Sequence, residues 1–169
     1  KTGIDLPAES APVAGVTYHS LNSMGIVELS SSSFGQTFQV TPIQMITAIS
    51  AVANGGKLMT PYLVQKQLDA KGNVINETQP TVRRQVISEQ TARIVADMME
   101  GVVSGGTGKN AYVAGYRVAG KTGTSQKIGT AQGEYVASFG CFAPADDPEI
   151  AMLILVDEPV GQINGGQIC

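Results

Sequence analysis

A helical pattern of apolar positions runs through residues 42–54. The apolar residues of this stripe are Ile43, Met45, Ile46, Ile49, Val52 and Ala53. Thr41 is placed to cap the helix, with Pro42 in the first turn and Gln44 completing a capping box. Asn54 and the two glycines that follow are typical of a helix end. The pattern predicts a largely buried helix over residues 42–54.

A second helix is predicted from Ser88 to the glycine pair Gly105-Gly106. Ser88 is a favoured N-cap, and Glu89 lies in the first turn, where the helix dipole favours an acid. The apolar positions of this segment are Ala92, Val95, Met98 or Met99, and Val102. Residues 1–35 have little periodicity and many Gly, Ser and Pro residues, so we expect loops and short turns there.

Several short runs have the pattern of β-strands. Strands are predicted at residues 61–68, 81–87, 113–124, 134–143 and 149–157, with a hairpin turn at residues 69–73. Ile150 to Val156 is apolar on both faces, so we expect this strand in the middle of a covered sheet. The short link at residues 144–148 favours antiparallel pairing of the last two strands. Together these elements predict an α+β fold, with a mostly antiparallel sheet and packed helices.

Composition and charge narrow the possible functions. The 169 residues have a hydrophobic content of 43% and a net charge of −3, which allows a folded core and argues against nucleic acid as a partner. The longest apolar run is far shorter than the roughly 20 residues that cross a bilayer. The single histidine, His19, has no companion set for a usual zinc site.

Residues 118–125 contain the most informative motif of the chain. Lys121, Thr122, Gly123 and Thr124 form a K-T-G-T sequence on a predicted strand, which resembles the K-T-G box of penicillin-binding proteins and serine β-lactamases. Gly123 lacks a side chain, so an extended substrate can pair with the strand backbone. The Thr122 and Thr124 hydroxyls can bind a terminal carboxylate, and Lys121 adds positive charge. The backbone amide of Thr124 is the predicted oxyanion donor.

The same residues also match a phosphate-binding loop. The sequence from Gly115 to Thr122 fits the pattern G-x-x-x-x-G-K-[ST]. That motif needs a strand before the loop and a helix beginning at the lysine. Residues 116–119 have a strand pattern and residues 122–126 lack an apolar helical face, so we favour the K-T-G interpretation. A nucleotide-binding domain stays open as the alternative.

The flanking sequence resembles the class B penicillin-binding proteins, which are peptidoglycan D,D-transpeptidases. The resemblance rests on a series of segments in the family's order along nearly the whole chain. These segments begin at Lys1, Phe34, Val40, Gly106, Val118, Ala137, Phe142, Val156 and Gly165. Gln36 and Thr41 lie in matching segments, where we expect them to support structure rather than chemistry.

The resemblance implies the C-terminal portion of a single transpeptidase domain at residues 1–169. The family's serine nucleophile belongs to an S-x-x-K motif that this chain lacks, so we expect the nucleophile and the S-x-N box before residue 1. Ser20 and Asn22 form an S-x-N string at the wrong place in the family's order, and Lys1-Thr2-Gly3 is followed by isoleucine. We therefore interpret neither as functional, and expect the 169 residues alone to be inactive.

The family resemblance also implies substrates, partners and location. The parent protein would cross-link D-Ala-D-Ala stem peptides through an acyl-serine, and β-lactams would acylate the same serine. A membrane glycosyltransferase is the implied partner, no metal or cofactor is needed, and the parent would lie outside the cytoplasm on a membrane anchor, while this portion itself would be soluble. A non-catalytic module of the same fold is a further alternative.

The remaining candidates have simpler structural explanations. We expect His19 to have a surface or packing role. The acidic pair Asp146-Asp147 precedes a proline and is a predicted turn, and Asp157-Glu158, at a strand end before a proline, is a predicted turn or cap. Residues expected in the core are Cys141, Met45, Met98 and Met99.

Overall fold

The computed structural model describes residues 1–127 and 134–169, and the chain divides into two compact units. Unit 1 comprises Lys1–Thr47 and Met59–Arg83, and unit 2 comprises Ala48–Leu58 and Arg84–Cys169. The combination of helices and antiparallel sheets confirms the predicted α+β class. No helix in the described part of the chain is long and apolar enough to cross a membrane.

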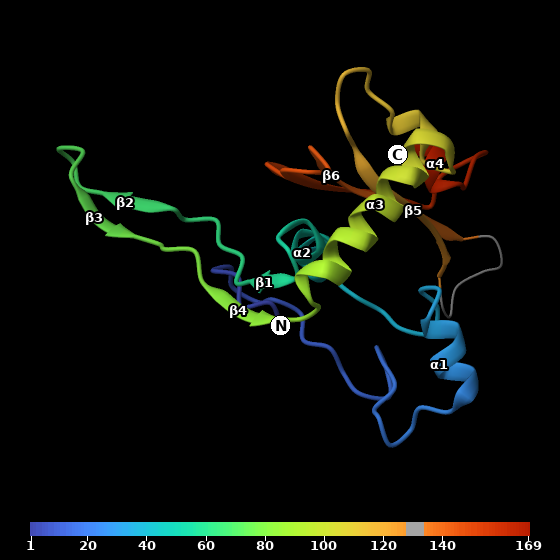
Figure 1. Cartoon of the computed structure of the whole chain (residues 1–169). Helices are drawn as coiled ribbons and strands as arrows, with labels where there is room; N and C mark the ends of the chain where they lie inside the picture. Colours follow the sequence, from blue (N-terminus) through green and yellow to red (C-terminus); the bar gives the residue numbers. More distant parts are fainter. Residues whose placement is uncertain (128–133) are drawn as a thin grey trace. The chain divides into compact units, whose positions relative to one another are not determined.

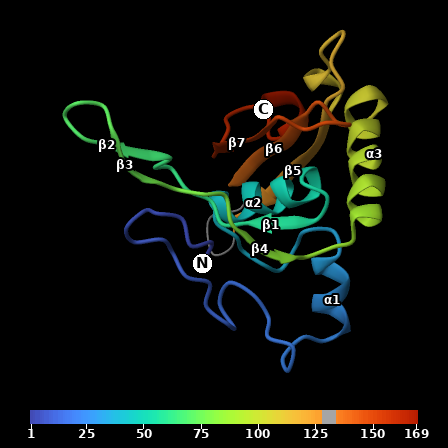
Figure 2. The ribbon, with the colours of Figure 1, turned by 60° about the vertical axis from the view of Figure 1, so that its left-hand side comes forward.

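Unit 2 is built on a three-stranded antiparallel sheet with the order β5-β6-β7. β5 and β6 are labelled in Figure 1, and all three strands are labelled in Figure 2. Its strands are β5 (Ala119–Gln126), β6 (Tyr135–Ala143) and β7 (Ile150–Asp157). The expected antiparallel pairing is therefore correct, but the last strand is not central in the sheet that the described residues form. Within residues 1–127 and 134–169, β6 is the middle strand, and the apolar β7 lies at an edge with Ile150 and Met152 exposed. A continuous apolar run indicates a strand but does not say which strands will flank it.

A single core joins the helices of unit 2 to this sheet. α3 (Glu89–Gly105) runs along β5, as Figure 2 shows. Its N-cap is the predicted Ser88, whose hydroxyl accepts a hydrogen bond from the Thr91 amide at 3.0 Å. Ala96, Ala119 and Phe142 form the buried cluster. The side chains packed against this cluster are Ile49, Val52, Ala53, Met99 and Ala145.

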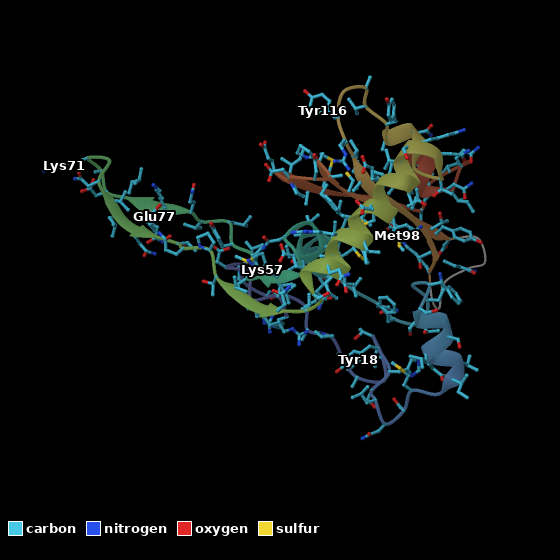
Figure 3. All side chains as sticks on the ribbon, viewed as in Figure 1. Tyr18, Lys57, Lys71, Glu77, Met98 and Tyr116 are labelled. Atoms are coloured by element: carbon cyan, nitrogen blue, oxygen red, sulfur yellow. The ribbon has the colours of Figure 1, made fainter. Side chains whose placement is uncertain are left out.

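Several expected buried positions are exposed instead. α2 (Pro42–Ala53) has the predicted bounds within one residue, but only Ala51 of this helix is buried. Met45 is exposed, and so is Met98 on α3 (Figure 3). Met99 does pack against the core, and Cys141 is half-buried. Helical spacing defines a stripe, whereas the packing partner decides how much of the stripe is covered.

β5 begins later in the chain than the strand predicted from residue 113. Residues 113–118 form no strand, because the chain turns at Gly115, which has φ +87°, and the Tyr116 amide donates to the Val113 carbonyl at 3.0 Å. A short 3-10 helix, η1 (Lys109–Ala111), precedes this turn. The C-terminal α4 (Gly165–Ile168) packs against β5 and β6.

Unit 1 contains a helix that the periodicity did not predict. α1 (Ile26–Ser32) begins with a capping arrangement in which the Gly25 amide donates to the Glu28 carboxylate at 2.9 Å. None of its residues is buried. A helix of two turns without a buried face gives no clear apolar period, so the expectation of loops and turns for residues 1–35 was wrong here.

The middle of the chain forms two small sheets. β2 (Lys66–Leu68) and β3 (Val74–Glu77) form the predicted hairpin, with Lys71 at its tip (Figure 3). β1 (Lys57–Met59) pairs with β4 (Val82–Gln85). The strand expected at residues 61–68 is reduced to its last three residues. The amides of Leu63 and Val64 instead donate to Asp5, at 2.7 and 2.9 Å.

Candidate functional site

The four residues of the K-T-G-T motif all lie within β5. Thr122 pairs with Phe139 and Gly123 with Ser138 of β6. Among the described residues β6 is the only strand beside β5, so the opposite edge of β5 has no strand neighbour. Because side chains alternate along a strand, Thr122 and Thr124 share one face and Lys121 and Gly123 the other. An edge strand with this alternation can receive an extended peptide.

This geometry overturns the phosphate-loop alternative. That motif requires a helix beginning at Lys121, whereas residues 119–126 form a strand. Gly115 belongs to a separate turn before the strand. The match to G-x-x-x-x-G-K-[ST] is therefore a coincidence of letters, and the nucleotide-binding hypothesis is wrong.

The two threonine hydroxyls of β5 meet segments that are distant in sequence. Thr122 Oγ1 lies 3.1 Å from Thr107 Oγ1, in the turn that follows α3. Thr124 Oγ1 accepts a hydrogen bond from the Gly165 amide at 3.2 Å. Both hydroxyls are thereby held on one face of the strand.

Close backbone packing holds the C-terminal segment over β5. A Cβ at Gly165 would lie 2.4 Å from the Gly123 carbonyl oxygen and 2.2 Å from that of Ser138. A Cβ at Gly166 would lie 2.2 Å from the Thr107 carbonyl oxygen. The Asn110 side-chain amide also donates to the Gly166 carbonyl at 2.9 Å. Glycine is therefore required at both positions by contact with backbone atoms.

An open groove of about 480 Å³ lies between these segments. Its walls are Thr122 and Thr124 of β5, residues 106–110 except the buried Gly108, and residues 164–167. Lys109 is the only charged residue among the described residues that line it, and it forms no ion pair within the described part of the chain. The groove therefore presents hydroxyls, amides and one ammonium group, which suit an anionic ligand.

Lys121 is exposed and does not line this groove. Its Nζ donates to the Thr122 carbonyl oxygen at 2.7 Å. The ammonium group therefore lies along the strand, close to the Thr122 peptide.

Two ion-pair clusters stabilise the ends of the strand. Lys127 contacts Asp157 at 2.8 Å and also pairs with Glu158, and these carboxylates raise the pKa of Lys127. Asp157 is the last residue of β7, and only Glu158 lies in the bend that follows the strand; both carboxylates are ion-pair partners of Lys127.

The second cluster lies before the strand. Arg117 binds Glu100 through two nitrogens, at 2.7 and 2.8 Å, and Asp146 at 3.0 Å. Hydrogen bonds from the guanidinium lower the pKa of the Glu100 carboxyl. These contacts join the C-terminal part of α3 to the segment entering β5 and to the bend between β6 and β7. They are structural, because none of these side chains lines the groove.

The other sequence candidates lie outside this site. Ser20 shares a hydrogen bond with Ser23, 3.0 Å between their hydroxyl oxygens, and with Asn22 and His19 it belongs to unit 1. Burial raises the pKa of the Cys141 thiol, as expected for an unreactive cysteine. Within the described ranges no group of three or more His, Cys, Asp or Glu residues could hold a metal ion.

Thr107, Asn110 and the Gly165-Gly166 pair have no chemical role that the sequence predicts. Thr107 and the glycine pair lie in segments that contributed only to the family resemblance, and Asn110 lies outside those segments. The sequence features that could have pointed to these residues are the glycine pair and the G-T-G turn that contains Thr107, both far from the K-T-G motif. Such a signal gains meaning only when the chain path brings these segments to β5.

Comparisons with known proteins agree with the resemblance. A family model for the penicillin-binding protein transpeptidase domain matches residues 1–168. The chain is 43% identical to stage V sporulation protein D of Bacillus subtilis over 170 residues, covering 98% of this chain and 26% of that protein. It is 31% identical to the peptidoglycan D,D-transpeptidase FtsI of Escherichia coli K12 over 148 residues, covering 84% of this chain and 23% of that protein.

Solved structures show the same fold. Penicillin-binding protein 3 of Mycobacterium tuberculosis in complex with ampicillin superposes with a TM-score of 0.84 at 31% identity, covering 98% of this chain and 38% of that one. The chain spans about a quarter of the length of the curated relatives it matches. The family match over 168 residues, the fold and the order of the motifs lead to one conclusion: this chain belongs to the penicillin-binding protein transpeptidase domain family.

Proposed function

We propose that this chain is the C-terminal portion of the transpeptidase domain of a class B penicillin-binding protein, which cross-links peptidoglycan stem peptides. The observation that carries the proposal is the K-T-G-T sequence on an edge strand, with both threonine hydroxyls facing a groove without carboxylates. The domain's S-x-x-K serine and S-x-N box belong to residues that precede this chain.

The edge of β5 receives the donor stem peptide in an extended conformation. Backbone pairing along the strand orients the peptide, and Gly123 adds no side chain that would obstruct it. The terminal carboxylate accepts hydrogen bonds from Thr122 and Thr124. Lys121 and Lys109 supply positive charge on the two sides of the strand.

The reaction proceeds in two acyl transfers. The serine Oγ, its proton taken by a base of the active site, bonds to the carbonyl carbon of the penultimate D-Ala. The peptide C–N bond breaks, and the terminal D-Ala leaves with a proton on its amine. An amine of a neighbouring strand then attacks the ester, which forms a new amide and returns the proton to serine. The Thr124 amide stabilises the oxyanion in both steps.

The wider setting follows the family. β-Lactams acylate the same serine, as the ampicillin and aztreonam complexes of the tuberculosis protein suggest. The parent protein works at the outer face of the bacterial membrane, beside a glycosyltransferase that supplies the glycan strands. The 169 residues alone are inactive because the nucleophile is absent from them.

Covalent labelling tests this proposal directly. The longer protein containing the S-x-x-K serine is expected to bind fluorescent penicillin in a one-to-one adduct, and replacing that serine by alanine abolishes the adduct. The isolated 169 residues are expected to show no added mass after incubation with penicillin. An adduct on the isolated chain would contradict the assignment of the nucleophile. A longer protein that is never labelled would instead indicate the non-catalytic module.

A substitution within β5 tests the assigned carboxylate site. Thr124→Val in the longer protein should lower the acylation rate by a penicillin roughly ten- to a hundredfold, since a hydrogen bond to a charged group contributes about 1.5–3 kcal/mol. Thr91→Val is the matched control, because it also removes an exposed threonine hydroxyl with a hydrogen-bond partner, here the Ser88 hydroxyl at 2.8 Å, but at the start of α3. Equal rates for the Thr124 variant and the control would exclude Thr124 from the site.

A further inference from the structure

The hydroxyls of Thr122 and Thr124 can bind a carboxylate only as donors. Each hydroxyl has one proton to donate and two lone pairs that accept. A carboxylate has only acceptors, so each threonine proton must point at it. The hydrogen bonds that these hydroxyls make with the protein therefore decide whether the site is prepared for an anion.

A backbone amide leaves the Thr124 hydroxyl free to donate its proton to an anion. The Gly165 amide can only donate, and its bond to Thr124 Oγ1 at 3.2 Å occupies one lone pair of that oxygen. The hydroxyl proton of Thr124 stays available for the groove. The position of the amide is determined by the glycine, which is buried against the Gly123 and Ser138 carbonyls.

Thr122 has a different partner, a second hydroxyl. Thr107 Oγ1 lies 3.1 Å away, and either oxygen can be the donor. If Thr122 donates to Thr107, its proton is lost to the groove. If Thr107 donates, Thr122 keeps its proton for the ligand. An anion in the groove selects the second arrangement, because only that arrangement gives both strand hydroxyls a free proton.

Hydrogen bonds and close packing hold the backbone around Thr107 in place. The Gly106 and Gly108 amides both donate to the Val102 carbonyl, at 3.1 and 3.0 Å, which fixes the turn on the end of α3. Gly108 is buried, and a Cβ there would come within 3.1 Å of the Phe139 ring. On the other side Gly166 packs against the Thr107 carbonyl. The backbone that carries the exposed Thr107 side chain is therefore fixed beside Thr122.

We infer that Thr107 is a positioning residue, which donates its hydroxyl proton to Thr122 and so directs the Thr122 proton toward the carboxylate of the substrate. The inference rests on the proposed function and adds a residue outside the K-T-G-T motif to the recognition of that carboxylate. Without the Thr107 donor, Thr122 has no partner fixing its proton. Recognition of an anionic ligand is then weakened more than that of a neutral one.

The test compares two β-lactams on the longer protein that contains the S-x-x-K serine. One is ampicillin with its free carboxylate, and the other is an ampicillin ester in which that carboxylate is blocked. The measured quantity is the second-order acylation rate constant for each compound. Thr107→Val is expected to lower the rate with ampicillin by up to about tenfold, the upper end of what one neutral hydrogen bond contributes, and the rate with the ester less than twofold. Thr107→Ser, which keeps the hydroxyl, should restore the ampicillin rate to within about twofold of wild type.

Two further variants separate positioning from folding. Thr91→Val removes a comparable hydroxyl contact elsewhere in unit 2 and should leave the ratio of the two rates unchanged. Thr107→Ala provides the same measurement without added bulk if the valine variant lacks a thermal unfolding transition. A parallel fall of both rates in the Thr107 variants, or no fall in either, would overturn the inference alone. A wild-type protein that neither compound acylates would overturn the proposed function and the inference with it.

Discussion

The two units differ in what stabilises them. All buried hydrophobic side chains of the described residues lie in unit 2, on α2, α3, β5 and β6. In the described part of unit 1 the one buried residue is Thr2, which is polar. In unit 1, carboxylates instead bind the backbone of loops. Asp5 accepts hydrogen bonds from two backbone amides, and Glu9 accepts them from the amides of Thr2 and Gly3.

This difference shows where the candidate site obtains its rigidity. The groove belongs entirely to unit 2, where strand pairing and a hydrophobic core hold each hydroxyl in place. Unit 1 leaves large apolar residues exposed, including Ile26, Val27 and Ile75, and is ordered mainly by local hydrogen bonds. Substitutions should therefore have much larger effects on stability in the core of unit 2.

The largest expected effect is that of Phe142→Ala. Phe142 is 1% exposed in the core of unit 2, and its truncation should lower the free energy of unfolding by about 3–5 kcal/mol. The free energy of unfolding is measured by denaturant titration of the chain, and amide hydrogen exchange in β5 and β6 is measured separately. Ile75→Ala in the β2–β3 hairpin is the control, with an expected change below about 0.5 kcal/mol because this side chain is exposed. Comparable losses for both variants would show that the two regions do not differ in this way.

A smaller effect is expected from added methyl groups at glycines. Gly165→Ala places a Cβ against two carbonyl oxygens and should cost about 1–3 kcal/mol by overpacking. Gly15 of unit 1 has no atom within 4 Å of a Cβ, but its φ is +78°. Gly15→Asn should therefore cost less than about 1 kcal/mol, because asparagine tolerates positive φ. Thermal unfolding of both variants provides the comparison, and a harmless Gly165→Ala would mean that α4 is not closely packed on β5.

The smallest expected effect is that acid weakens the stabilisation of unit 1 by Glu9. Hydrogen bonds from the Thr2 amide and hydroxyl lower the pKa of Glu9 to about 2. Because the folded pKa lies below the unfolded value of 4.5, the stabilisation is complete above pH 4.5 and is lost as the pH falls toward 2. NMR titration of the Thr2 and Gly3 amides should show this transition in the wild-type chain and not in Glu9→Gln. A midpoint near 4.5 would show that these hydrogen bonds do not persist in solution.

Local signals in the sequence predicted much of the fold. The Thr41–Gln44 capping box is present as expected, with the Thr41 amide donating to Gln44 at 2.8 Å and the Gln44 amide to Thr41 at 3.3 Å. The bounds of β6 and β7 agree with the predicted strands to within one residue. These signals act between residues close in sequence. Their effect on the backbone therefore depends less on distant segments than burial does.

The site was only partly predictable. The K-T-G-T letters and the strand carrying them were evident, because the motif and its flanking pattern are continuous in sequence. Thr107, Lys109 and Gly165 could not be assigned to it in the same way. Thr107 is 15 residues from Thr122, and Gly165 is 41 residues from Thr124. A local sequence pattern does not predict that residues so far apart in the chain form a hydrogen bond.

By itself, the sequence determined the positions of the main helices and strands, the family and the strand that presents two hydroxyls on one face. Only the tertiary structure decided that β7 is an edge strand, that Met98 is exposed, and that Thr107 and Gly165 reach those hydroxyls. The physical reason is that helix caps and side-chain alternation arise from neighbouring residues, whereas burial and hydroxyl contacts depend on which distant segments the folded chain brings together.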